Sequence, residues 1–258
     1  MNASSVLLIL HALTTSVAAV SAPAPAPVER VDSSWFEDKG ASSSGRALSP
    51  FGLFPIWENT ATVLGHGQVY LGSHLLGVGL GDRLQIGTHP VRDVMFTPNL
   101  HAKFLVFERP RLRIAAHAEV LWMTQGASQA FTVSNFVSRL STVENAFWVA
   151  PLGVTASIAP MRGLFVHVTT TAQGVTSKAL PEPQVTFGVS AQLEWRPFEH
   201  HAFTFHAAEV GLHRHDYALV GASYRYQRWI FEGSIGYARR FYRDGGQGFP
   251  IAALGVEL

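Results

Sequence analysis

The sequence contains no cysteine, and only 14% of its 258 residues are charged. The absence of cysteine excludes disulfide bonds and thiolate metal sites. An average soluble domain carries about 25% charged residues, so part of the folded surface is predicted to face something other than water. The 19 basic and 18 acidic side chains almost balance, which argues against a nucleic-acid partner, since such proteins usually carry a clear basic excess.

Long hydrophobic runs are also scarce. Beyond the N-terminus, no segment offers the roughly 20 consecutive apolar residues that a membrane helix needs, although 47% of the residues are hydrophobic. Inside lipid every backbone amide must be paired, so a chain without membrane helices can span the bilayer only as a closed β-barrel. Composition therefore favours a membrane barrel.

The N-terminal region differs from the rest of the chain. Residues 1–22 contain an apolar core followed by small residues and are predicted to be a secretory signal peptide, although no Lys or Arg precedes the apolar core. Residues 23–58 begin with a Pro-Ala repeat and continue with many serines, which predicts a periplasmic linker. Residues 59–258 then form the barrel.

Apolar and polar residues alternate along residues 184–196 without a break. Val185, Phe187, Val189 and their successors share one face, and Gln184, Thr186, Gly188 and their successors share the other. Soluble strands usually run about 5–6 residues, whereas a tilted membrane strand needs about 9–11. The length of this segment favours a transmembrane barrel over a soluble β-sandwich.

Several other segments repeat this alternation, and short and long polar breaks alternate between them. This pattern predicts an all-β fold, a transmembrane antiparallel up-and-down β-barrel with short periplasmic turns and longer outer loops. Eleven strands can be placed between residues 67 and 258. Because bacterial barrels have an even number of strands, a further strand is expected within 59–64 or 47–57. About 12 strands are predicted, with 10 as the alternative and bulges at 73–76 and 207–208.

In a membrane barrel the apolar face of each strand contacts lipid and the polar face lines the lumen. Four tryptophans at strand ends on the apolar face are expected to lie at the membrane interfaces: Trp122, Trp148, Trp195 and Trp229. The side chains expected to line the lumen are His101, Lys103, Arg111, Arg113, His117, Glu119, His167, Glu194, Arg196, His206, Arg225, Glu232 and Arg240.

Residues 79–87, Gly-Leu-Gly-Asp-Arg-Leu-Gln-Ile-Gly, are followed by Pro-Asn-Leu-His-Ala-Lys-Phe at 98–104. This pattern resembles a group of Gram-negative outer-membrane barrels described as porin-like or transporter-like. The resemblance is close over 79–104 and rests elsewhere on strand pattern alone. It implies that Asp82 and Arg83 occupy a periplasmic turn and that the C-terminal strand carries the assembly signal, although this chain ends in Leu258 where the group usually has Phe.

Two functions remain open from the sequence. The first is a narrow passive channel for small solutes, whose histidines would change its selectivity as they protonate near pH 6–7. The second is a non-conducting structural or surface-binding barrel in which the same charged residues only hold the shape. The predicted partners are outer-membrane lipid and, during biogenesis, the barrel-assembly machinery, with the outer membrane as the location.

Enzymatic and metal-dependent functions have little support. The sequence has no Gly-x-Ser-x-Gly motif, phosphate loop or dinucleotide fingerprint. A lipid hydrolase would need a Ser–His pair on the lipid-facing surface, and only His74 beside Ser73 is a candidate. His213, His215 and Asp216 could bind a metal, but they lie in a polar segment. We therefore expect no catalytic residues, metal or cofactor.

Overall fold

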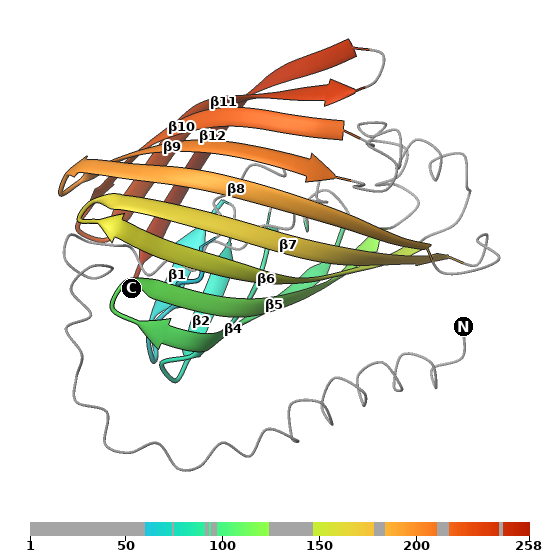
Figure 1. The fold of residues 1–258 in the computed structure, drawn as a ribbon. Helices are drawn as coiled ribbons and strands as arrows, with labels where there is room; N and C mark the ends of the chain where they lie inside the picture. Colours follow the sequence, from blue (N-terminus) through green and yellow to red (C-terminus); the bar gives the residue numbers. More distant parts are fainter. Residues whose placement is uncertain are drawn as a thin grey trace. The chain divides into compact units, whose positions relative to one another are not determined.

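A computed structural model describes residues 60–73, 75–90, 93, 97–123, 147–177, 184–210, 217–242 and 245–258. These residues form one closed sheet of twelve antiparallel strands, β1 to β12 (Figure 1). Within these ranges, no helix is long and apolar enough to cross a membrane. The predicted all-β barrel and its strand number are confirmed.

The strands follow one another around the wall in chain order. Their bounds are Val69–Gly72 (β1), Leu76–Leu80 (β2), Leu84–Thr88 (β3), Asn99–Arg109 (β4), Leu112–Met123 (β5), Phe147–Met161 (β6), Leu164–Ser177 (β7), Gln184–Phe198 (β8), His201–Val210 (β9), Tyr217–Arg228 (β10), Phe231–Tyr242 (β11) and Gly245–Glu257 (β12). Each strand pairs with its neighbour in sequence, and β12 pairs with β1 to close the ring. Two backbone hydrogen bonds between Val69 and Leu258, of 2.9 and 2.8 Å, fasten the closure.

The twelfth strand comes from a different place than predicted. Residues 69–80 were expected to be one strand with a bulge at 73–76, but they form the hairpin β1–β2, in which the N–H of Gly72 donates to the carbonyl of Leu75 at 2.8 Å. Residues 60–64 form no strand and lie inside the barrel. The alternation of apolar and polar residues is interrupted by a turn as well as by a bulge. The sequence alone therefore does not distinguish a hairpin from one bulged strand.

The positions of the bulges also differ from the prediction. Register shifts occur between Leu105 and Phe107, between Ile158 and Met161, and between Trp195 and Phe198. No shift occurs at residues 207–208, where the pairing with both neighbouring strands is continuous. The observed bulges lie toward the ends of the strands that the short turns join, a common position for bulges in barrels.

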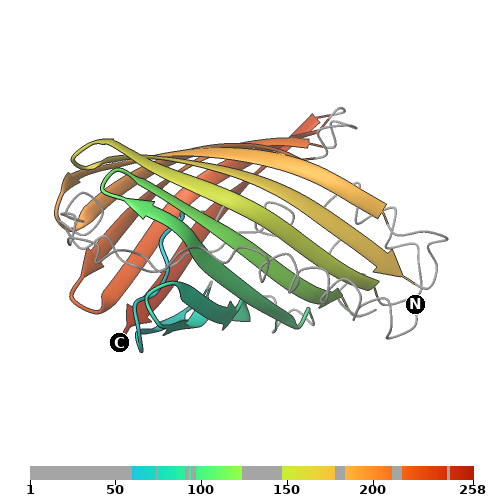
Figure 2. The same cartoon turned by 60° about the horizontal axis from the view of Figure 1, so that its bottom comes forward.

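The short turns lie at one end of the barrel, here called the short-turn end, together with Leu258 (Figure 2). They are centred on residues 81–83, 110–111, 162–163, 199–200 and 229–230. The other end, here called the loop end, carries the longer connections at 89–98, 124–146, 178–183 and 211–216. Short and long connections alternate from β2 to β11 as predicted, but β1–β2 and β11–β12 are joined toward the loop end by short connections, at 73–75 and 243–244.

The wall of the barrel has unequal height. Strands β4 to β12 contain 10 to 15 residues, long enough to cross the hydrocarbon layer. Strands β1, β2 and β3 contain only four or five residues. As a result, only three residues of β12, Gly255–Glu257, pair with β1. An apolar groove of about 640 Å³ lies beside this step, lined by residues that include Leu71, Leu76, Phe231 and Leu254.

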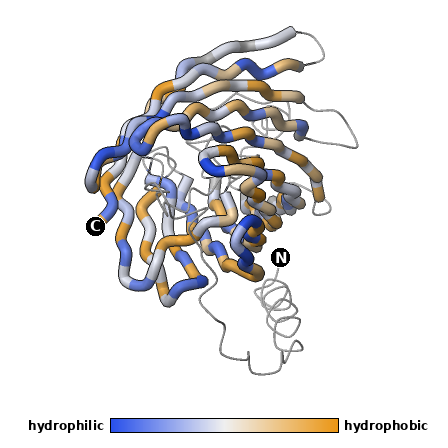
Figure 3. The backbone as a smooth tube through the Cα atoms, turned by 60° about the vertical axis from the view of Figure 1, so that its left-hand side comes forward, coloured by the Kyte–Doolittle hydropathy of each residue, from blue (hydrophilic) through white to orange (hydrophobic). Residues whose placement is uncertain are grey.

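The apolar face of the long strands points outward. Val185, Phe187, Leu193 and Trp195 of β8 are exposed, whereas Thr186, Gln192 and Glu194 are buried on the inner side. The other long strands repeat this alternation (Figure 3). A water-soluble barrel or sandwich would have the opposite arrangement, with the large apolar side chains inside. The outer face of this barrel is therefore suited to contact with lipid.

Candidate functional site

The lumen is lined by polar and charged side chains from most strands. All the side chains that the sequence assigns to the lumen face inward, except Arg111, and most of them are buried. Arg111 is exposed in the turn between β4 and β5. Because β5 begins at Leu112, Arg111 lies just outside the strand, and its assignment to the lumen stays a prediction.

Glu194 is the centre of the densest charge cluster in the lumen. Its side chain is fully buried on β8, and its Oε1 accepts hydrogen bonds from Arg196 of the same strand and, at 2.6 Å, from Nη2 of Arg225 on β10. His167 of β7 places its Nε2 3.7 Å from the other carboxylate oxygen. One buried carboxylate thus contacts side chains from three strands, β7, β8 and β10.

Three lumen histidines lie directly opposite glycines in the adjacent strand. The register pairs His101 with Gly87, His117 with Gly153, and His206 with Gly221. A Cβ atom at Gly153 or Gly221 would collide with the ring of the paired histidine. These glycines give the imidazole rings room to lie against the wall, a signal that was present in the sequence but becomes readable only once the register is known.

Residues 60–65 enter the lumen ahead of β1. The Nζ of Lys103 donates to the carbonyl oxygens of Thr60 at 2.7 Å and of Thr62 at 2.9 Å. The N–H of Ala61 donates to Ser157 Oγ at 2.7 Å, and Ser157 Oγ also lies 2.7 Å from His167 Nδ1. Residues 60–65 are named the inner segment below.

A third contact continues along the inner segment. The N–H of Leu64 donates to Oε1 of Gln85 on β3 at 3.1 Å. The side chain of Leu64 packs with Tyr70 and Leu75 in a fully buried apolar cluster. Lys103, Gln85 and Ser157 themselves have no accessible surface, so their contacts with the inner segment are enclosed within the barrel.

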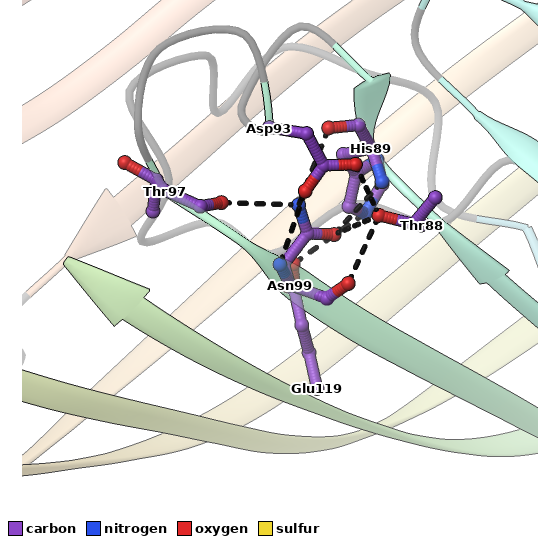
Figure 4. Close-up of polar contacts among 6 residues, drawn as sticks. All are labelled: Thr88, His89, Asp93, Thr97, Asn99 and Glu119. Atoms are coloured by element: carbon purple, nitrogen blue, oxygen red, sulfur yellow. Dashed lines mark hydrogen bonds and ion pairs between the residues drawn. The ribbon is translucent and has the colours of Figure 1, made fainter. Parts of the chain in front are cut away.

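A polar network secures the connection between β3 and β4 (Figure 4). Asn99 Nδ2 donates to Asp93 Oδ1 at 3.0 Å, and the Thr88 hydroxyl donates to Asp93 Oδ2 at 2.6 Å. The N–H of His89 donates to Asn99 Oδ1 at 2.8 Å, and His89 Nε2 lies 3.6 Å from Glu119 Oε1. His89 was not among the side chains that the sequence assigned to the lumen, although it is buried beside Glu119.

The outward face carries aromatic side chains near both ends. Trp122 and Trp148 are register partners and stack at 5.4 Å near the loop end, and Trp195 lies 5.8 Å from Phe203 near the short-turn end. Trp229 lies in the turn between β10 and β11 and not in a strand, with a φ of 56°. Because β10 ends at Arg228, Trp229 directly follows the strand, and its position at the membrane interface stays a prediction.

One histidine, His201, lies on the outward face. His201 begins β9, and its Nδ1 lies 2.7 Å from the Tyr224 hydroxyl on β10. The sequence analysis found no lipid-facing histidine other than the ambiguous His74, so this placement is a correction. The hydrogen-bond partner of His201 is a tyrosine, not the serine that a hydrolytic Ser–His pair would need.

Several predictions fall outside the described residues: the signal peptide, the linker at 23–58, His74, and the His213–Asp216 cluster. Asp82 and Arg83 lie exposed in the β2–β3 turn. Within the described ranges, no group of three or more His, Asp or Glu side chains could hold a metal ion.

No protein-family model and no curated protein match the sequence. Among solved structures, the chain is similar to a loop-deletion mutant of OmpT, an outer membrane protein of Vibrio cholerae, with 13% identity and a TM-score of 0.41 over 74% of this chain and 62% of that chain. It is also similar to the CymD monoaromatic hydrocarbon channel, with 10% identity and a TM-score of 0.42 over 76% of this chain and 90% of that chain.

A FadL homologue of Pseudomonas aeruginosa gives a further similarity, with 10% identity and a TM-score of 0.35 over 78% of this chain and 70% of that chain. The chain thus spans about 62% of the length of the OmpT mutant that it matches. At these identities the likeness concerns the fold alone, and no solute or activity follows from it. The architecture rests on the chain's own strands, which form a closed antiparallel ring with an apolar outer face, as in outer-membrane β-barrels.

Proposed function

We propose that this chain is an outer-membrane barrel that acts as a narrow passive channel for small solutes, and that its inner segment closes it. The observation that carries the proposal is a polar, charged lumen inside an apolar outer wall. A barrel that served only as a scaffold could fill its interior with apolar side chains, which need no partners. Polar side chains along the lumen suit the passage of water and small polar solutes.

The closed state follows from the contacts of the inner segment. Three side chains that bind the segment come from three different strands: Lys103, Gln85 and Ser157. Each bond replaces a hydrogen bond that the segment would otherwise make to water, so the neutral bonds to Gln85 and Ser157 each contribute only about 0.5–1.5 kcal/mol and those from Lys103 about 1.5–3 kcal/mol. Hence loss of a few of these bonds is expected to shift the segment out of the lumen.

The test is single-channel recording in planar bilayers. Substitution of both Ala61 and Leu64 by proline removes the N–H groups that donate to Ser157 and Gln85 and leaves the wall unchanged. We expect the double variant to conduct at least tenfold more than the natural chain. His66→Ala, at an exposed position just after the inner segment, is the control and should conduct like the natural chain. A folded double variant that never conducts would refute the channel.

The second function, a non-conducting structural or surface-binding barrel, is the outcome that such a silent variant would support. The histidine hypothesis is separate. Conductance of the double variant should change between about pH 5 and pH 8, the range in which histidines commonly titrate. If conductance stays flat across that range, the histidines do not tune the pore, and the channel proposal is unaffected.

A further inference from the structure

The lumen holds the inner segment mainly by its peptide groups. Lys103 binds two carbonyl oxygens, Ser157 accepts one backbone N–H, and Gln85 accepts another. None of these four hydrogen bonds involves a side chain of residues 60–65. Any short peptide that fits the same space could therefore form them.

The space around the inner segment selects for side-chain size. Ala61 and Leu64 are fully enclosed, and Thr60 and Val63 are nearly so. Leu64 contacts Tyr70 and Leu75, which form an apolar pocket for a side chain of moderate volume. Because buried charge without a partner is costly, this site disfavours charged side chains and favours small or medium apolar ones.

Lys103 adds a further element of recognition. Its ammonium group has no accessible surface and points at two main-chain oxygens. A free peptide ends in a carboxylate, and hydrogen bonds between an ammonium and a carboxylate are stronger than those to neutral carbonyls. A soluble peptide could therefore bind Lys103 at least as well as the inner segment does.

We infer that Lys103, Gln85 and Ser157 form a binding site for short peptides with small apolar side chains, which the inner segment occupies in the closed state. Such peptides would then be solutes of the channel, and residues 60–64 would act as an internal competitor for them. This inference rests on the proposed channel function and adds a solute class to it.

The experiment uses the full-length chain carrying Ala61→Pro and Leu64→Pro in a planar bilayer, with trialanine as the probe and a disaccharide as the comparison. Trialanine is expected to reduce the current with increasing concentration, whereas the disaccharide at equal concentration leaves it nearly unchanged. Adding Lys103→Met should raise the half-blocking concentration of trialanine at least tenfold. Adding Ser157→Ala should raise it by a smaller factor, because only one neutral hydrogen bond is lost.

Each outcome bears on a different claim. Absence of current in the double variant refutes the channel itself. Current that trialanine and the disaccharide reduce equally, or that trialanine reduces equally well without Lys103, overturns the peptide site and leaves the channel in place. Should the Lys103→Met chain fail to fold, as judged by loss of heat-modifiable migration on gels, the Ser157→Ala chain gives the comparison. An unchanged half-blocking concentration there also overturns the site.

Discussion

At the scale of single residues, Glu194 shows how this barrel handles charge in its interior. A buried carboxylate is tolerated only where opposite charges and hydrogen bonds surround it. Arg196, Arg225 and His167 supply them from β7, β8 and β10. The sequence predicted that these four side chains face inward, but not that they converge on one carboxylate. Alternation identifies the face of a residue, whereas its height in the lumen depends on strand register.

The contribution of Glu194 can be measured with an isosteric substitution. Glu194→Gln removes the charge that two arginines share, so we expect the free energy of unfolding in lipid vesicles to fall by about 3–5 kcal/mol, the usual cost of breaking a buried ion pair. Glu108→Gln is the matched control. Its partner Arg113 lies 2.6 Å away, but the Glu108 side chain is 39% exposed, and exposed pairs contribute only about 0–1 kcal/mol. Equal losses in the two variants would contradict the role of Glu194.

At the scale of elements, β12 shows features of an edge strand. The N–H of Ser73 donates to the carbonyl of Leu254, and the N–H of Leu254 donates to Ser73 Oγ, so the backbone groups of Leu254 face β1. The direction of the backbone N–H and C=O groups alternates from one residue to the next along a strand. The backbone groups of Pro250, four residues before Leu254, therefore point to the same side, beyond the last residue of β1. Proline lacks an N–H and is confined in sheets to such edges. Pro250 therefore fits a part of β12 that the short strands β1–β3 leave without a partner.

A pair of substitutions tests this reading of β12. Pro250→Ala should change the free energy of unfolding by no more than about 0.5 kcal/mol, because its N–H would face no described strand. Ala222→Pro also changes an exposed, outward position, but Ala222 pairs with Phe205 and Tyr237 on both sides. This substitution removes a ladder bond and should cost about 1–3 kcal/mol. If Pro250→Ala proved as costly as Ala222→Pro, β12 would not be an edge.

The alternation of apolar and polar residues predicted the long strands well and the short strands β1–β3 poorly. Residues 184–196 alternate so regularly that β8 follows from them directly. The hairpin at β1–β2 has strands of four and five residues, too short for alternation to distinguish from one bulged strand. The inner segment has no sequence signal at all, since its placement depends on side chains 21 to 96 positions away in the chain.

At the scale of the whole molecule, the apolar outer face of the barrel is the surface that contacts lipid in the proposed function. The exposed face of the long strands carries large apolar side chains on every side of the ring, including Leu100, Val154, Leu193, Phe205 and Ile235. Burying such a face in hydrocarbon contributes about 25 cal/mol per Å² of apolar surface removed from water. The low charge and the lack of membrane helices predicted a membrane barrel, and the strand length and the strand-end tryptophans predicted that its apolar face points outward.

The most direct measurement uses the natural absence of cysteine. Single cysteines placed at Leu193 and Val220 on the outer face, and at Gln192 and Ser223 on the inner face, can each carry a nitroxide spin label in lipid vesicles. We predict that labels at 193 and 220 collide more often with oxygen, which concentrates in hydrocarbon, than with a water-soluble nickel complex, and that labels at 192 and 223 do not. Outer-face labels reached more readily by the nickel complex, or shielded from both reagents, would contradict the membrane barrel.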